Sequence, residues 1–399
     1  MIPLSVFQAL LTDTGRRALT RAAELDPTGE TFLAALTKLQ KQYDSDLAKA
    51  ALETIILRRK AAAKFTRADS MYFTRAGLEM ASSEIISRYR ARRFAPFNRI
   101  LDLCCGLGGD TLGLCAQSGK SHLTAIDLDP LHLALAQRNL AAYDLTAHFV
   151  ESDLTKTPLP PAQAAFFDPG RRAADRRRFS VRHYHPPLNQ IDSWLPRLPA
   201  LGVKISPGVD LAEIEHYDCE IEFISLDGDL KECVLWFGPF KTAHRRATLL
   251  NSHSSPISLI SPAASLLPVS LSPPLTYLYE PDPAILRAGL VRDLAVQLGA
   301  AQLDPDIAYL TSESLTPTPF ARAYTLEAAM PFSQKRLREK LRALKVGRVT
   351  VKKRGSPLDP GPFARSLKLK GDEARIVFLT HVSGQAWALI GNRIRGHWK

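Results

Sequence analysis

The sequence is poor in cysteine and has no long apolar run. Five of its 399 residues are cysteines; Cys104 and Cys105 are adjacent, and the others are scattered without CxxC spacing. This pattern argues against a disulfide framework and a zinc site, so we expect no metal and a reducing, cytoplasmic location. No run of 18 or more apolar residues occurs, and residues 1–11 have neither a basic start nor a small-residue cleavage site. The sequence therefore predicts neither a membrane span nor secretion.

Acidic residues are scarce at one end of the chain. Residues 331–399 contain 17 Lys or Arg against four acids, an excess of +13, whereas the whole chain has a net charge of +12. The preceding residues are therefore close to neutral. A basic excess confined to one terminal module is typical of proteins that bind the phosphate backbone of nucleic acids. A basic face that only increases solubility is the alternative.

Hydrophobic spacing predicts an α/β fold after a helical start. Residues 28–93 have helical spacing, and after residue 99 short apolar runs alternate with helical stretches, which is typical of a parallel sheet covered by helices on both faces. The predicted strands are residues 100–104, 123–126, 148–150, 164–167, 202–205, 219–226 and 232–237. The turn signal Asp227-Gly228-Asp229 joins the last two. We therefore expect a seven-stranded, Rossmann-like sheet that is parallel and ends in an antiparallel hairpin.

Composition divides the chain into four expected segments. These are a helical N-terminal domain (1–95), the α/β core (96–243), a Ser/Pro-rich connection with an accessory helix (244–320) and a small basic α/β domain (321–399). Residues 249–274 are rich in Ser and Pro and predict an irregular connection. Within the last segment, residues 333–344 predict a basic helix, and residues 346–352 and 374–379 predict strands.

A glycine-rich loop follows the first predicted strand. Residues 102–110 read DLCCGLGGD and open a helix, where glycines let the backbone approach a ligand closely. Asp127 ends the next strand, in position to bind ribose hydroxyls. Asp153 and Asp168 follow the third and fourth strands, so these acids converge on the crevice where such sheets bind ligands. A turn cap at Asp102 and an ordinary surface acid at Asp153 are the alternatives.

These motifs, in this order, resemble class I S-adenosylmethionine-dependent methyltransferases over about residues 96–240. The resemblance implies S-adenosylmethionine as cofactor and Asp168 with Pro169 in the catalytic loop. A segment reading FTR at residues 73–75 precedes a helix, from which Arg75 could reach the cofactor carboxylate. The cofactor-binding residues expected on this basis are Asp102, Cys104, Gly106, Gly108, Asp127, Asp153 and Arg75. A dinucleotide-dependent dehydrogenase is the competing interpretation, but the loop reads GLGG rather than GxGxxG.

The fourth motif bears on the reaction. Methyltransferases acting on a base amine usually have Asp or Asn, then Pro-Pro and an aromatic residue, whereas here Asp168-Pro169-Gly170 is followed by arginine. Enzymes that methylate uracil at carbon 5 need a cysteine nucleophile after the fifth strand, where this chain has Ser206. We therefore expect direct transfer to a nitrogen, with Asp168 orienting the acceptor or accepting from it.

Basic residues follow this motif and recur near the C-terminus. The first group is Arg171, Arg172, Arg176, Arg177, Arg178 and Arg182, and the second is Lys352, Lys353, Arg354, Lys368 and Lys370. Arginine suits phosphates and bases, so both groups are candidates for RNA binding, and Tyr184 or Phe179 could supply a stacking surface. Solvated surface charge is the alternative for each.

The whole chain more narrowly resembles a group of bacterial methyltransferases that end in a THUMP-like domain. Further residues carrying this resemblance are Lys204-Ile205-Ser206-Pro207-Gly208 and Tyr279-Glu280-Pro281-Asp282-Pro283. The resemblance implies structured RNA, such as transfer or ribosomal RNA, as the substrate. Methylation of a protein or small molecule, or RNA binding without catalysis, stays open. The sequence does not indicate the oligomeric state.

Overall fold

The computed structural model describes residues 2–118, 122–170, 172–173, 176–177, 180–261 and 270–394. The chain forms two compact units, one of Met1–Cys219 with Cys233–Lys241 and one of Glu220–Glu232 with Thr242–Lys399. The chain therefore changes unit after residues 219, 232 and 241. No helix in the described ranges is long and apolar enough to cross a membrane.

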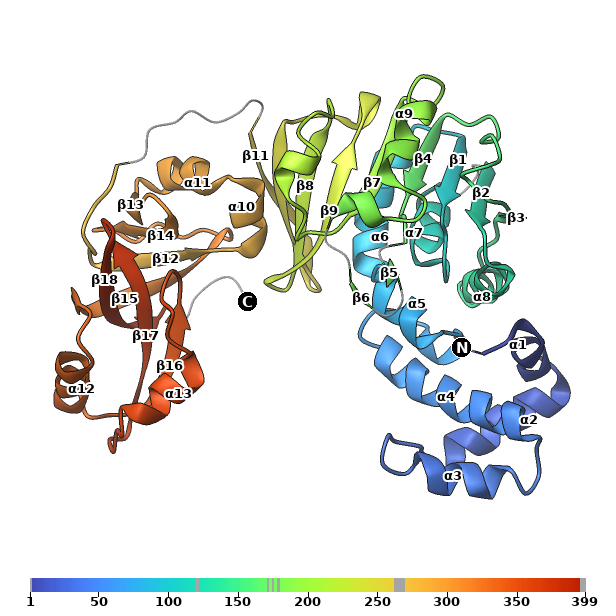
Figure 1. The fold of residues 1–399 in the computed structure, drawn as a ribbon, viewed down its shortest axis with the longest axis horizontal. Helices are drawn as coiled ribbons and strands as arrows, with labels where there is room; N and C mark the ends of the chain where they lie inside the picture. Colours follow the sequence, from blue (N-terminus) through green and yellow to red (C-terminus); the bar gives the residue numbers. More distant parts are fainter. Residues whose placement is uncertain are drawn as a thin grey trace. The chain divides into compact units, whose positions relative to one another are not determined.

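The first unit begins with helices that precede the α/β sheet region in the chain (Figure 1). They are α1 (Leu4–Leu10), α2 (Asp13–Glu24), α3 (Phe32–Leu39), α4 (Ser45–Ala61), α5 (Arg75–Met80) and α6 (Glu84–Ala91). The Asp44 side chain caps α4 by accepting from the backbone N–H groups of Asp46 and Leu47. The apolar faces of α1, α2, α3, α4 and α5 pack with Leu107, Leu131 and Leu135. The helical segment is therefore part of the first unit.

All seven strands expected in the sheet are present, so the α/β fold is confirmed. They are β1 (Arg99–Leu103), β2 (His122–Asp127), β3 (His148–Glu151), β4 (Ala164–Phe167), β7 (Ala200–Ile205), β8 (Glu220–Leu226) and β9 (Asp229–Trp236). The intervening helices are α7 (Gly109–Ser118), α8 (Pro130–Ala141) and α9 (Ile191–Trp194). Neighbours from β3 to β7 pair in parallel, and β9 is antiparallel to β7.

The sheet has two strands more than expected, in the order β11-β10-β8-β9-β7-β4-β1-β2-β3. The added strands are β10 (Arg245–Asn251) and β11 (Ser254–Ser261). The prediction of an irregular connection is therefore wrong for residues 249–251 and 254–261. The buried Thr248 hydroxyl lies 2.8 Å from the Ser258 hydroxyl across the strand pair, so the serine takes part in the sheet. Pro256 is tolerated because β11 is an edge strand.

The second unit contains a seven-stranded sheet in the order β13-β14-β12-β15-β18-β17-β16. Its strands are β12 (Tyr277–Pro281), β13 (Ala301–Asp304), β14 (Ile307–Ser312), β15 (Ala321–Pro331), β16 (Val346–Lys353), β17 (Glu373–Val382) and β18 (Gln385–Arg393). Its helices are α10 (Pro283–Ala288), α11 (Val291–Leu298), α12 (Gln334–Ala343) and α13 (Pro360–Ser366). Because β12 pairs with β15, the segments on both sides of residue 320 share one sheet.

Candidate functional site

A cavity of about 220 Å³ opens within the first unit, at the carboxyl ends of the parallel strands. Six of the nine residues expected to bind cofactor or catalyse line it: Cys104, Gly106, Asp127, Asp153, Asp168 and Pro169. Asp102, Gly108 and Arg75 do not. The topology explains this convergence, because β1, β2, β3 and β4 are parallel neighbours whose ends meet at one edge.

The glycine loop leaves room for a ligand. Gly106 has a φ of +52°, and a Cβ atom placed there would meet no heavy atom within 4 Å. Its N–H donates to Asp127 Oδ2 at 2.8 Å, which fixes the loop against the end of β2. Gly108 has another role, because a Cβ there would lie 3.1 Å from side-chain atoms of Ala136 and Leu140 on α8. Gly106 therefore faces the cavity, and Gly108 allows close helix packing.

Asp127 is held as an ionised acceptor. Its Oδ1 accepts from the Asp129 N–H at 3.0 Å and lies 3.2 Å from His132 Nδ1. Burial would raise the pKa of Asp127, but the hydrogen bond and charge of His132 and the backbone N–H groups lower it below its usual value. Burial would lower the pKa of His132, but the hydrogen bond and charge of Asp127 raise it overall. His132 also lines the cavity, and sequence reasoning missed it.

Asp102 lies behind the loop rather than in the cavity. Its side chain is fully buried, and Oδ2 accepts from the Thr111 hydroxyl at 2.5 Å. Its Oδ1 has no hydrogen-bond partner in the part of the chain that the structure describes. Burial, together with the negative charge of Asp110, raises the pKa of Asp102 to about 8. Asp102 is therefore mainly uncharged at neutral pH.

Asp153 lines the cavity beside two leucines. Its Oδ1 accepts from the Thr155 N–H at 3.0 Å and hydroxyl at 2.6 Å, and these bonds together with Lys156 lower the pKa of Asp153. Leu128 and Leu154 line the same cavity, and Leu128 is 52% exposed. Apolar surface next to fixed acceptors suits a flat, polar-edged ring such as a nucleobase.

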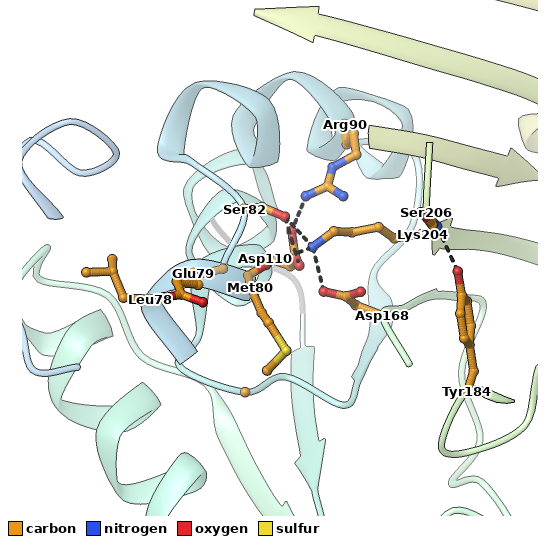
Figure 2. Close-up of polar contacts among 12 residues, drawn as sticks. Leu78, Glu79, Met80, Ser82, Arg90, Asp110, Asp168, Tyr184, Lys204 and Ser206 are labelled. Atoms are coloured by element: carbon orange, nitrogen blue, oxygen red, sulfur yellow. Dashed lines mark hydrogen bonds and ion pairs between the residues drawn. The ribbon is translucent and has the colours of Figure 1, made fainter. Parts of the chain in front are cut away.

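Asp168 is bound to a buried lysine that sequence reasoning did not assign to the site (Figure 2). Lys204, at the end of β7, is 1% exposed, and its Nζ donates to Asp168 Oδ2 at 2.6 Å and to Ser82 Oγ at 2.9 Å. A third acceptor, the Met80 carbonyl oxygen, lies 3.4 Å away. The available signal was the ionisable residue in an otherwise apolar, fully buried strand.

The segment after Pro169 forms a loop whose two ends are joined by backbone hydrogen bonds. Gly170 and His185 exchange backbone hydrogen bonds of 2.8 and 2.9 Å, and His185 lines the cavity, a role that sequence reasoning missed. Tyr184 was a candidate stacking residue, but it is buried and its hydroxyl accepts from the Ser206 N–H at 2.8 Å. Arg171, Arg178 and Phe179 lie outside the described residues. Of Arg172, Arg176 and Arg177 the backbone is described, in the short strands β5 (Arg172–Ala173) and β6 (Arg176–Arg177).

The structure does not bring Arg75 to the cavity. Its Nε donates to Glu53 Oε1 at 2.6 Å, and the side chain is 58% exposed. Gly77 and Met80 of the same helix line the cavity instead. Helix α5 therefore contributes to the site through other residues than the one expected.

The basic residues of the second unit do not form one row. Lys352 and Lys353 are consecutive in β16 and point to opposite faces of the sheet. Lys352 Nζ contacts Glu280 Oε2 at 2.5 Å, whereas Lys353, Lys368 and Lys370 are exposed. Arg354 lies over the Tyr309 ring, 5.2 Å from its centre.

Comparisons with known proteins identify the family. Family models match a methyltransferase domain at residues 100–168, a THUMP domain-like module at residues 321–393 and a domain of unknown function at residues 3–61. A protein of Mycobacterium tuberculosis named as an uncharacterized S-adenosylmethionine-dependent methyltransferase is 32% identical over 343 residues, which cover 83% of this chain and 92% of the relative. The chain belongs to the S-adenosylmethionine-dependent methyltransferases.

A solved structure from Porphyromonas gingivalis W83 has the same overall fold as this methyltransferase. The TM-score is 0.74 at 20% identity, and the match covers 95% of this chain and 99% of the other. The cofactor is S-adenosylmethionine, and the cavity fits it in two respects. Gly106 leaves open space at the loop, and Asp127 places a carboxylate in the cavity wall at the end of β2. The described ranges contain no cluster of His, Cys, Asp and Glu able to hold a metal ion.

Proposed function

We propose that this methyltransferase transfers a methyl group from S-adenosylmethionine to a base nitrogen in structured RNA by direct displacement. The observation that carries the proposal is Asp168: a carboxylate in the cavity wall, fixed by Lys204 at 2.6 Å, in a chain that also carries a basic module. A fixed carboxylate suits an amine acceptor, which donates N–H groups. The described part of the cavity wall contains Cys104 and Cys105, but burial raises the pKa of both thiols well above the usual value, which disfavours a cysteine nucleophile.

The cofactor would be held by the loop and the strand ends. The Gly106 backbone would face the methionine part, Asp127 would accept from the ribose hydroxyls, and Asp153 with Leu128 and Leu154 would surround the adenine. The bound cofactor supplies a methyl group already activated by a sulfonium. The protein therefore has mainly to bind and align the two reactants.

Asp168 would orient the acceptor. Its carboxylate would accept a hydrogen bond from the target N–H and hold the proton released as the nitrogen gains the methyl group. Pro169 and Gly170, which also line the cavity, would place backbone groups beside the target base. His185 lies on the same wall and offers a ring for stacking.

The RNA would dock on exposed cations of the second unit. Lys353, Lys368 and Lys370 are exposed and are the better candidates, because Lys352 is engaged by Glu280. Arg354 lines a separate cavity of about 520 Å³ in this unit together with Arg322 and Arg393. The match to a THUMP domain-like module supports this assignment.

The test is transfer of tritiated methyl groups to RNA isolated from a strain that lacks the gene. The wild-type protein should label RNA in a nuclease-sensitive form, and Asp168→Ala should lower the rate at least 100-fold. S-adenosylhomocysteine binding, measured by calorimetry, should persist in the variant. Label in protein or in small molecules instead of RNA would contradict the proposal and favour the alternative acceptors.

A further inference from the structure

Lys204 occupies an unusual position for a lysine. It is 1% exposed, at the end of the fully buried strand β7, yet oxygen acceptors of Met80, Ser82 and Asp168 are among the partners of its Nζ. Two of them, on Met80 and Asp168, belong to residues that line the cavity. A buried charge costs much free energy unless it is paired, so the partners of this cation indicate its role.

The charged groups around Lys204 show which negative charges its ammonium group compensates (Figure 2). Figure 2 shows the carboxylates of Asp110 and Asp168 with the cations of Arg90 and Lys204. The buried carboxyl group of Asp102 interacts with the charges of Asp110, Asp168 and Arg90. Arg90 forms an ion pair with Asp110 and lies over the Phe166 ring, 4.4 Å from its centre. Asp102 is mainly uncharged at neutral pH because burial and Asp110 raise its pKa to about 8. The Lys204 ammonium group contacts the Asp168 carboxylate at 2.6 Å.

Asp168 without this cation would be a half-buried carboxylate near other acids. Its side chain is 19% exposed, and its negative charge is one of the causes that raise the pKa of Asp102. Like charges at close range in a poorly solvated site favour protonation of one partner. A protonated Asp168 would present a hydroxyl to the target N–H and could no longer take its proton.

We propose that Lys204 is a positioning residue for methyl transfer, which keeps Asp168 ionised and its carboxylate fixed at the cavity wall. The proposal rests on the proposed function, since Asp168 is the group through which Lys204 acts. Lys204 also joins the strand β7 to residues 80–82, which contribute Met80 and Ala81 to the cavity. It thereby connects the catalytic loop with the segment that follows helix α5.

The chain offers a matched control for a purely structural effect. Lys64 Nζ donates to the carbonyl oxygens of Leu78 at 2.7 Å and Ala81 at 2.8 Å, so it holds the same segment that Lys204 contacts. A further contact of the same ammonium group is the Glu79 carbonyl oxygen at 3.3 Å, so Lys64 holds backbone oxygens of this segment. Lys64→Met therefore loosens residues 78–81 and leaves the Lys204–Asp168 pair in place.

The experiment compares Lys204→Met, Lys64→Met and wild type for methyl transfer to RNA, with S-adenosylhomocysteine binding measured on each protein. Lys204→Met should lower kcat about 100-fold or more and change the RNA KM and the inhibitor Kd less than about fivefold. Its rate should recover toward higher pH, where Asp168 loses its proton. Lys64→Met should keep kcat within about threefold and show no such change in pH profile.

A double variant keeps the test valid if Lys204→Met does not fold. Asp168→Asn with Lys204→Met removes both charges, which avoids a buried unpaired ion. Its rate should equal that of Asp168→Asn alone, because Lys204 acts through Asp168. The proposal is overturned if Lys204→Met keeps a wild-type kcat, or if Lys204→Met lowers the rate of Asp168→Asn as much as that of wild type. Should the label enter protein or small molecules instead of RNA, the proposed substrate is wrong, and the same variants test Lys204 on that acceptor.

Discussion

At the scale of residues, the site depends on carboxylates whose surroundings set different protonation states. Asp127 is kept ionised by His132 and two backbone N–H groups, whereas burial keeps Asp102 mainly uncharged. The strand ends could be located from the sequence because short apolar runs precede each acid. The partners of these acids could not be located from the sequence. Lys204, for example, is 36 residues from Asp168 in the chain and is brought to it by the parallel pairing of β4 and β7.

The His132–Asp127 pair gives a prediction about pH. In wild type the raised pKa of His132 means that the pair stabilises the fold below about pH 6.5, and this stabilisation is lost as the pH rises through the raised value. Asp127→Asn removes the hydrogen bond and the charge that raise the His132 pKa most, while the burial and the charge of Asp129 remain, so the His132 pKa should fall. NMR titration of the His132 ring checks this, and an unchanged pKa in the variant would contradict it. Affinity for S-adenosylhomocysteine should fall about 10-fold or more, because a charged acceptor is lost.

Two glycines of the same loop should respond differently to alanine. Both Gly106 and Gly108 have positive φ, so each substitution carries a similar backbone strain of about 1 kcal/mol. Gly106→Ala places its methyl group in open space at the cavity and should weaken cofactor binding. Gly108→Ala presses on Ala136 and Leu140 and should lower the thermal midpoint more. Calorimetric affinity and thermal unfolding of both variants provide the check, and identical behaviour of the two would count against these roles.

At the scale of elements, strands distant in sequence are tied by a few buried polar groups. Glu280 on β12 accepts from the Tyr324 hydroxyl on β15 at 2.7 Å and from Lys352 on β16 at 2.5 Å. In the sequence, Glu280 was only part of the motif at residues 279–283, and Lys352 was a candidate for RNA binding. The contact between Glu280 and Lys352 could not be foreseen, because β12 and β16 are far apart in the chain and β15, β18 and β17 stand between them in the sheet order. The β11 strand was missed for a related reason. Its serines and proline indicated a loop in the sequence, whereas its edge position in the sheet allows them in a strand.

Removing the Glu280 carboxylate should weaken the second unit. Burial would raise the pKa of Glu280, but Lys352 and Tyr324 lower it overall. The contribution of Glu280 to the stability of the fold is therefore present at a pH above the ordinary pKa of a glutamate. It is lost as the pH falls through the lowered pKa. Glu280→Ala should cost about 1–3 kcal/mol, because Lys352 and Tyr324 lose a half-buried partner. Chemical denaturation at pH 7 and in acid measures both effects. A variant as stable as wild type at pH 7 would show that the three-residue cluster contributes nothing.

At the scale of the whole molecule, the sequence predicted the fold and the cofactor class because the strand pattern and the order of acids are local features. The division into modules was harder to foresee. The residues that were expected to form a connection instead pair with strands of both neighbouring segments, as β12 does with β15. A truncation at residue 331 would remove β16, β17 and β18 from the sheet. RNA docking is therefore better tested by point substitutions than by deletion.

Removal of exposed cations should weaken RNA binding without affecting the cofactor. Lys353→Ala, Lys368→Ala and Lys370→Ala combined should raise the RNA Kd and reduce its dependence on salt, by up to about three in the log–log slope. Arg348, an exposed residue of β16 outside the proposed set, provides a matched control as Arg348→Ala. Equilibrium binding at several salt concentrations measures the slope. An unchanged slope in the triple variant would place the docking surface elsewhere.

The most direct measurement is nucleoside mass spectrometry of RNA methylated in vitro by the wild-type protein and by Asp168→Ala. The account predicts a nucleoside that is heavier by one methyl group on a base nitrogen, formed by wild type and absent with Asp168→Ala. A methyl group on the ribose or on carbon 5 of a pyrimidine, or no methylated nucleoside at all, would contradict it.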